Sequence, residues 1–187
     1  MVYVFLADGF EEIEALAPVD MLRRARVEVR TVKAEDGVSK NKNEVTSSKN
    51  IKIIADMLID AVSLDNLEMI VLPGGLPGVD NLYKSEKLEE IIAHCVKNNI
   101  RIGAICAAPS ILARLGYLKN IKATAYPSFR HYLAENGAVV SEEKVITDGI
   151  FTTAAGAGVS LEFALELVRV LKGDEPAGKI GEQILFY

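Results

Sequence analysis

The segment Gly103-Ala104-Ile105-Cys106-Ala107-Ala108-Pro109 decides the fold. The apolar run 100–105 leads into a helical pattern, 109–115, with no loop between them and the cysteine at the junction. A strand that turns directly into a helix strains the backbone of the turning residue, and small alanine neighbours give it clearance. The N–H groups of the following helix then point toward the sulfur and favour a thiolate. We therefore expect a reactive thiol at Cys106, the alternative being a buried, inert cysteine.

Short apolar runs alternate with helical patterns along the rest of the chain. Nearly continuous apolar runs are typical of strands that are covered on both faces. Their alternation with helices predicts a doubly wound, mostly parallel α/β sheet. The expected strands are 2–7, 27–32, 69–72 and 100–105, and the expected helices are 11–24, 85–98, 109–115 and 159–171.

Three further stretches are less regular. The polar stretch 35–50 predicts a loop or a weak hairpin, and 175–187 predicts a docked helix or part of a subunit contact. The region 123–150 predicts a short strand, a short helix near 128–135 and an edge hairpin around Thr147-Asp148-Gly149.

Composition limits the classes of protein that fit. A chain of 187 residues suits one domain, 1–187, with one substantial core. Its net charge of −5 lacks the basic footprint of a nucleic-acid-binding protein. The apolar start, 1–9, is too short for a membrane span and lacks a cationic flank, so we expect a buried first strand, no membrane partner and a cytoplasmic location. The two cysteines are then expected to be free thiols.

Three other segments follow expected strands, at the edge where sites of open α/β sheets gather. Glu14 lies on an uncharged helical stripe with Ala17, Pro18 and Met21. This segment alone favours an exposed glutamate at a helix start, and the alternative is a partly buried carboxyl with a raised pKa. Gly74 and Gly75 can turn N–H groups toward an anion or can form a plain tight turn.

The remaining polar candidates are weaker. The segment Ala155-Gly156-Ala157-Gly158 is either a wall of the pocket or a loop before a helix. Cys95 falls on an apolar helical stripe and is expected in the core. Two isolated histidines give no metal site at the usual spacings, and the phosphate-loop and dinucleotide fingerprints are absent from the sequence.

Taken together, Gly9-Phe10-Glu11-Glu12-Ile13-Glu14, Leu72-Pro73-Gly74-Gly75 and the cysteine segment resemble the ThiJ/PfpI superfamily over essentially the whole chain. The similarity is closest to its Parkinson-disease protein deglycase (DJ-one) branch. The resemblance implies a flavodoxin-like sandwich of the class I glutamine amidotransferase type, a homodimer, and no metal or organic cofactor. It also implies a nucleophilic Cys106, a largely protonated Glu14 bonded to the sulfur, and an anion pocket of backbone amides that includes Gly75 and Ala107.

The sequence departs from the pattern of these relatives at three positions. Ala107 stands where the protease-like branch has a histidine, which disfavours an intracellular cysteine peptidase. Tyr126 and Ala155 stand where the deglycase branch often has histidine and arginine, and we expect Tyr126, Gly156 and Ala157 along the pocket wall. The predicted function is cofactor-free glyoxalase or deglycase chemistry on methylglyoxal, similar aldehydes or their adducts. The alternative is a redox-sensing or chaperone-like protein in which Cys106 is oxidised to sulfinic acid.

Overall fold

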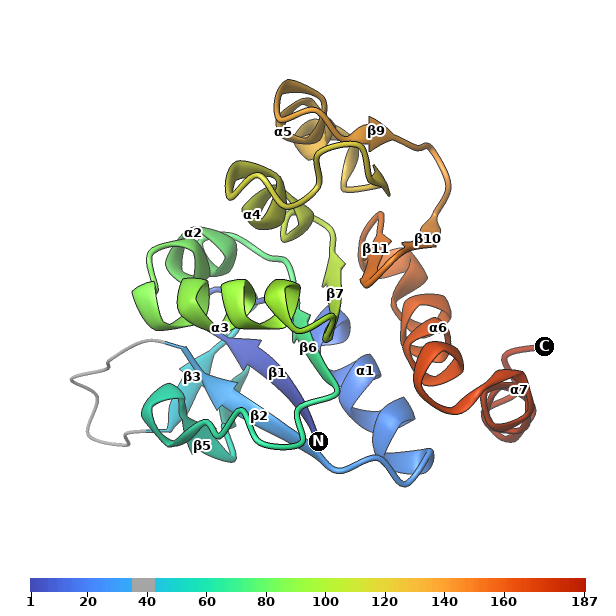
Figure 1. Ribbon diagram of the computed structural model, residues 1–187. Coiled ribbons are helices and arrows are strands. Elements are labelled where there is room, and N and C mark those ends of the chain that lie inside the picture. Colours follow the sequence, from blue (N-terminus) through green and yellow to red (C-terminus); the bar gives the residue numbers. More distant parts are fainter. Residues whose placement is uncertain (35–42) are drawn as a thin grey trace.

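A seven-stranded sheet forms the centre of the molecule (Figure 1), for which a computed structural model describes residues 1–34 and 43–187. The strand order is β10-β11-β7-β6-β1-β2-β5, and all neighbours are parallel except β10 and β11. The expected doubly wound α/β sheet is thereby confirmed. The bounds are β1 Val2–Leu6, β2 Val29–Lys33, β5 Met57–Leu58, β6 Met69–Leu72, β7 Arg101–Ile105, β10 Val145–Asp148 and β11 Phe151–Ala154.

Helices cover both faces of this sheet. Figure 1 shows α1, α6 and α7 on one side of it and α2 and α3 on the other. The helices are α1 Glu12–Arg24, α2 Gly78–Tyr83, α3 Glu86–Lys97, α4 Pro109–Arg114, α5 Arg130–Glu135, α6 Ser160–Lys172 and α7 Asp174–Gln183. The long helices expected at 11–24, 85–98 and 159–171 are therefore present, and α7 docks on α6 as a helix at the end of the chain.

The pleat of β1 explains why its apolar run is continuous. Tyr3 and Phe5 point into the cluster beneath α2, α3 and α4, whereas Val4 and Leu6 point into the cluster beneath α1 and α6. Successive side chains of a strand face opposite sides, so a strand covered twice must be apolar at every position. Phe5 is fully buried, and its replacement by alanine is expected to cost about 3–5 kcal/mol of unfolding free energy.

The irregular stretches form small hairpins and turns. The part of the stretch 35–50 that the structure describes belongs to an antiparallel hairpin, β3 Glu44–Thr46 with β4 Lys52–Ile54, while 35–42 lie outside the described residues. In the region 123–150, β10 and β11 form the expected hairpin, which turns at Gly149 with φ 59°. The remaining elements are β8 Lys122–Ala123, β9 Val139–Val140 and the 3-10 turns η1 Ile59–Ala61, η2 Pro127–Phe129 and η3 Ala157–Val159.

Within residues 1–34 and 43–187, no helix is both long enough and apolar enough to cross a membrane.

Candidate active site

The strand order places three sequence segments at one edge of the sheet. From β1 the chain moves outward to β2 on one side, and it later returns to β6 and β7 on the other. The order therefore reverses between β1 and β6, and such a switch point opens a crevice at the carboxyl ends of the strands. Glu14 follows β1, Gly74 and Gly75 follow β6, and Cys106 follows β7. The structure thus brings together the residues that the sequence singled out separately.

Cys106 occupies a sharp turn between β7 and α4. Its φ is 64°, in the left-handed region that non-glycine residues seldom adopt. Two hydrogen bonds hold this conformation: the Cys106 N–H donates to the Ala154 carbonyl at 2.9 Å, and the Tyr126 N–H donates to the Cys106 carbonyl at 2.8 Å. The neighbours Ala104 and Ala107 are buried, which explains why small side chains are needed there. The turn leaves the thiol half-buried.

Glu14 reaches the same crevice from the first turn of α1. It is only 1% exposed, so the exposed glutamate that the segment alone favoured is wrong and the buried alternative is confirmed. The Gly74 N–H donates to Glu14 Oε2 at 2.9 Å, and the Glu14 N–H donates to the Glu11 carboxylate that caps the helix at 2.7 Å. The other oxygen, Oε1, has no partner of good geometry among the described residues. The Cys106 thiol and the Ala157 N–H approach the carboxyl in looser geometry.

Only glycine fits at position 74, because the chain passes between the acid and the thiol there. A Cβ added to Gly74 would lie 2.6 Å from Glu14 Oε2 and 2.7 Å from Cys106 Cβ. Both distances are shorter than van der Waals contact, so any side chain would push the two groups apart. The Gly74 N–H is engaged by Glu14, which leaves Gly75 and Ala107 as the two members of the expected amide pocket that face the sulfur.

Burial governs the protonation of Glu14. Removal from water raises the pKa of Glu14 from 4.5 to about 7, and the charge of Glu11 adds to this effect. Hydrogen bonds from the Cys106 thiol and from the N–H groups of Gly74 and Ala157 lower the same pKa. The carboxyl therefore exchanges its proton near neutral pH, where it can both give and take one.

The helix start predicted that the pKa of the Cys106 thiol is lowered. The structure corrects that prediction for the state in which Glu14 is ionised. The pKa of Cys106 is raised to about 12. Burial is the largest cause, the charge of Glu14 and its hydrogen bond to the thiol act in the same direction, and the N–H groups of Ala107 and Gly75 lower the pKa. The helix behind Cys106 is short and begins with Pro109, which has no N–H to contribute. When Glu14 holds the proton, its charge no longer raises the pKa of Cys106, and its hydrogen bond lowers that pKa, because a neutral acid donates to a thiolate. Coupled groups of this kind titrate as a pair.

A cavity of about 370 Å³ opens above the sulfur. A Cβ added to Gly156 would lie 3.9 Å from Sγ and 3.3 Å from the Tyr126 ring, so these two residues lie beside the thiol. Ala157 contributes its N–H to Glu14 and does not line this cavity. The cavity is lined by Glu11, Ser48, Lys49, Gly75, Leu76, Cys106, Ala107, Tyr126, Ser128 and Phe129.

The family model that matches this chain is the DJ-1/PfpI family, over residues 1–170. The chain belongs to the DJ-1/PfpI family. Among curated members, it is 38% identical over 185 residues to Protein DJ-1 homolog B of Arabidopsis thaliana, covering 98% of this chain and 41% of that protein. It is 28% identical over 170 residues to the glutathione-independent glyoxalase DJR-1.2 of Caenorhabditis elegans, covering 91% and 87%. The chain thus spans less than half the length of the plant relative.

A solved structure of the DJ-1/PfpI family has the same fold. The oxidized DJ-1 of Toxoplasma gondii superposes with a TM-score of 0.90 and 35% identity, covering 98% of this chain and 97% of that one. The resemblance that the glycine and cysteine segments indicated is therefore confirmed at the level of the family and its fold.

The sequence did not indicate the β3–β4 turn as part of the site. Ser48 and Lys49 line the cavity, although they lie far from the other segments in a stretch that the sequence describes only as polar. The Ser48 N–H donates to the Phe10 carbonyl at 2.7 Å, just before α1. A serine followed by a lysine offers no periodic or glycine-rich signal, so only the folded chain shows this contact.

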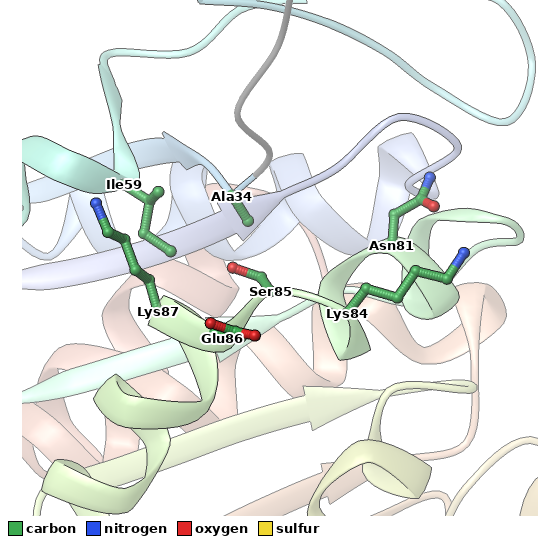
Figure 2. Close-up of a pocket in the computed structure, with 7 residues that line it drawn as sticks. All are labelled: Ala34, Ile59, Asn81, Lys84, Ser85, Glu86 and Lys87. Carbon is green, nitrogen blue, oxygen red and sulfur yellow. The ribbon is translucent and has the colours of Figure 1, made fainter.

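A second hollow lies beside the end of β2 and the start of α3 (Figure 2), with a volume of about 550 Å³. It contains no cysteine, and its Lys87 is paired with Asp60. Its lining residues are Ala34, Ile59, Asn81, Lys84, Ser85, Glu86 and Lys87. In the described part of the chain, no three His, Cys, Asp or Glu side chains are grouped to hold a metal ion.

Proposed function

We propose that this protein is a cysteine-dependent, cofactor-free enzyme of the glyoxalase or deglycase type. The observation that carries the proposal is the pairing of a half-buried thiol at a strained elbow, Cys106, with a buried acid that titrates near neutrality, Glu14. Membership of a family that includes a glutathione-independent glyoxalase supports it. The substrates are 2-oxoaldehydes such as methylglyoxal, or the adducts that they form.

The reaction begins with the sulfur. The Cys106 thiolate attacks the aldehyde carbon, and the oxygen of the resulting hemithioacetal is stabilised by the N–H groups of Gly75 and Ala107. These two amides already act on Sγ, which supports their role as donors to the new oxygen. A proton then completes the hydroxyl group of the adduct.

Glu14 moves the next proton. It removes the proton from the former aldehyde carbon and returns a proton to the neighbouring carbon, while the hydroxyl proton of the adduct passes to the neighbouring carbonyl oxygen. The hemithioacetal thereby becomes a 2-hydroxy thioester. Water hydrolyses the thioester, releases the hydroxy acid and regenerates the thiol, so the sum is methylglyoxal plus water to lactate. A group with a pKa of about 7 suits both halves of this transfer. Tyr126, which is half-exposed above the thiol, replaces the histidine of many relatives and is not required by these steps.

Lactate formation from methylglyoxal tests the proposal. We expect turnover well above that of a free thiol at the same concentration, and a loss of about a hundredfold or more in Cys106→Ser, since the nucleophile is gone. Cys95→Ser is the matched control, because Cys95 lies in the core away from the cavity. Wild-type turnover at the rate of a free thiol would show that the protein is not such an enzyme.

A redox-sensing or chaperone-like role is the second candidate. The amides beside Sγ can also hold the oxygens of a sulfinate, and the Toxoplasma gondii relative is described as oxidized. Peptidase activity is disfavoured, because Ala107 provides no imidazole next to the nucleophile. Slow turnover combined with rapid oxidation of Cys106 to the sulfinate in mild peroxide would favour sensing over catalysis.

The proposal includes a homodimer. Ile13 and Leu16 of α1 are 56% and 40% exposed, and Leu161 and Leu185 lie exposed at the start of α6 and the C-terminus. Apolar patches of this kind mark interaction surfaces when they are continuous. Light scattering should give twice the mass of 20.3 kDa, and Ile13→Lys should shift it toward the single chain. A single-chain mass for the wild type at micromolar concentration would remove the dimer from the proposal.

A further inference from the structure

One unpaired cation stands at the rim of the Cys106 cavity. Lys49 is exposed and lines this cavity, and its ammonium makes no hydrogen bond or ion pair with the residues that the structure describes. The other charged group of the lining is Glu11, whose negative charge acts on Glu14 at the start of α1. Its carboxylate caps α1 by accepting from the Glu14 N–H, at the end of the helix that favours negative charge.

The turn that carries Lys49 is fixed over the site by hydrogen bonds to the loop after β1 and to α1. The Gly9 N–H donates to the Thr46 carbonyl at 2.8 Å, and the Lys49 N–H donates to Ser47 Oγ at 3.3 Å. Ser47 Oγ in turn donates to Glu12 Oε1 at 3.1 Å, within α1. The backbone of Lys49 is therefore positioned before any ligand arrives, which lowers the entropy cost of using its charge.

The cavity offers three kinds of contact. The amides of Gly75 and Ala107 act on the sulfur, Leu76 and Phe129 contribute apolar lining, and Lys49, an exposed lining residue, contributes a positive charge. A ligand that matches has a carbonyl at one end, a short carbon chain, and a negative charge at the other end. Lysine provides a point charge that suits a carboxylate or a phosphate equally.

We infer that Lys49 makes the site selective for 2-oxoaldehydes, or adducts of them, that carry an anionic group at the far end. This inference rests on the proposed function, since it names the substrate class of the same site. Lys49 acts here as a specificity-determining residue and takes no part in the bond-making steps. The chain has a net charge of −5, so a local cation beside the thiol favours the approach of an anionic substrate.

The first test needs no turnover. Iodoacetate and iodoacetamide alkylate the same thiolate and differ in one negative charge, so the ratio of their rates at Cys106 reports the local potential. We expect Lys49→Gln to lower this ratio about threefold to fivefold, the effect of one exposed charge, and Lys49→Glu to lower it about tenfold. The wild-type ratio should fall as salt is added, whereas that of Lys49→Gln should depend on salt less. Lys52→Gln is the matched control, because Lys52 lies on the same hairpin, pairs with Glu44 and does not line the cavity.

The second test uses turnover. The selectivity is the kcat/KM for a 2-oxoaldehyde that ends in a carboxylate, dioxovalerate, divided by the kcat/KM for the neutral 2-oxopentanal. We expect this selectivity to fall about threefold to fivefold in Lys49→Gln and to stay at the wild-type value in Lys52→Gln. Activity on both substrates with a selectivity that is the same in Lys49→Gln would overturn the inference and leave the proposed function standing. Absence of turnover on every 2-oxoaldehyde, with an alkylation ratio that still depends on Lys49, would overturn the proposed function and with it the substrate class.

Discussion

The two cysteines of this protein have pKa values raised to the same level for different reasons. Burial alone raises the pKa of Cys95 to about 12, since its side chain is 0% exposed in the core beneath α3. At Cys106 the same value of about 12 combines burial with the negative charge of Glu14, and it is opposed by two backbone N–H groups. Only at Cys106 do some of these causes depend on the protonation of a neighbour, Glu14.

This difference distinguishes a thiol that is buried in the core from one that we expect to react. Cys95 can become a thiolate only when its surroundings open to water, whereas Cys106 can do so when Glu14 takes the proton. The pair then carries one negative charge in either arrangement, and the two arrangements differ only in which atom holds the proton. Reactivity therefore depends on partners at the sulfur more than on the pKa of the isolated thiol.

The largest expected effect is a difference in alkylation between the two thiols. In the folded protein, Cys106 should react with iodoacetamide about a thousandfold faster than Cys95, because Cys95 must wait for local opening. Peptide mass spectrometry over a time course measures both rates. In urea the two rates should become equal, and equal rates in the folded protein would contradict the distinction.

The pH profile of the same reaction sharpens the comparison. The Cys106 rate should rise as the pair loses its first proton near pH 7, the pKa of the buried acid, and not near pH 12. Glu14→Leu should shift the midpoint upward, because the thiolate loses a donor while the burial remains. A midpoint that is identical in wild type and Glu14→Leu would mean that Glu14 does not share the proton.

The next effect concerns the pH dependence of stability. The pKa of Glu14 is about 7 in the folded protein and has its ordinary value of 4.5 in the unfolded chain. The unfolded chain therefore releases this proton first as pH rises. The free energy of unfolding should therefore fall between pH 4.5 and 7 by about 3 kcal/mol, at about 1.4 kcal/mol per pH unit, and level off above pH 7. Urea denaturation of wild type and Glu14→Gln at several pH values measures this.

The control for that experiment is Glu89→Gln, which replaces an exposed glutamate of α3. Glu14→Gln should lack the fall, because a neutral amide does not titrate, and Glu89→Gln should retain it. The effect belongs to the Cys106 site, so Cys95→Ser should retain it as well. A fall of the same size in Glu14→Gln would assign it to other groups.

The smallest expected effect is on the products of oxidation. Mild peroxide should convert Cys106 to sulfinic acid and leave Cys95 a thiol, since thiolate character and access govern the first step. In Glu14→Gln a donor remains and the sulfinate should persist. In Glu14→Leu the share of other oxidation states should rise severalfold, as measured by intact and peptide mass spectrometry. A product as uniform as that of wild type would show that Glu14 does not hold the sulfinate.

The fold was largely predictable because its signals are local. The continuous apolar run before Cys106 and the helical periodicity of 85–98 and 159–171 correspond to β7, α3 and α6. Each signal follows from residues close together in the chain, since strand pleat and helical turn act over a few positions. The pairing of Glu14 with Cys106 was predicted only through a family resemblance, because no local pattern links positions so far apart.

The same limit explains the two points that needed correction or addition. The acidic thiol expected from the helix start considered one neighbour of Cys106 and omitted burial, which is a property of the whole packed core. Lys49 was overlooked because a lysine in a polar stretch is ordinary until the hairpin folds over the site. Both depend on contacts between distant segments.

The sequence by itself determined the doubly wound sheet and the elbow at Cys106, because periodicity and small residues encode them locally. The tertiary structure alone decided that Gly74 stands between the acid and the thiol, that the Gly74 N–H serves Glu14, and that Lys49 borders the cavity. Charges, hydrogen bonds and exclusion of water act through space. They therefore take effect only after the strands have brought remote residues to one edge of the sheet.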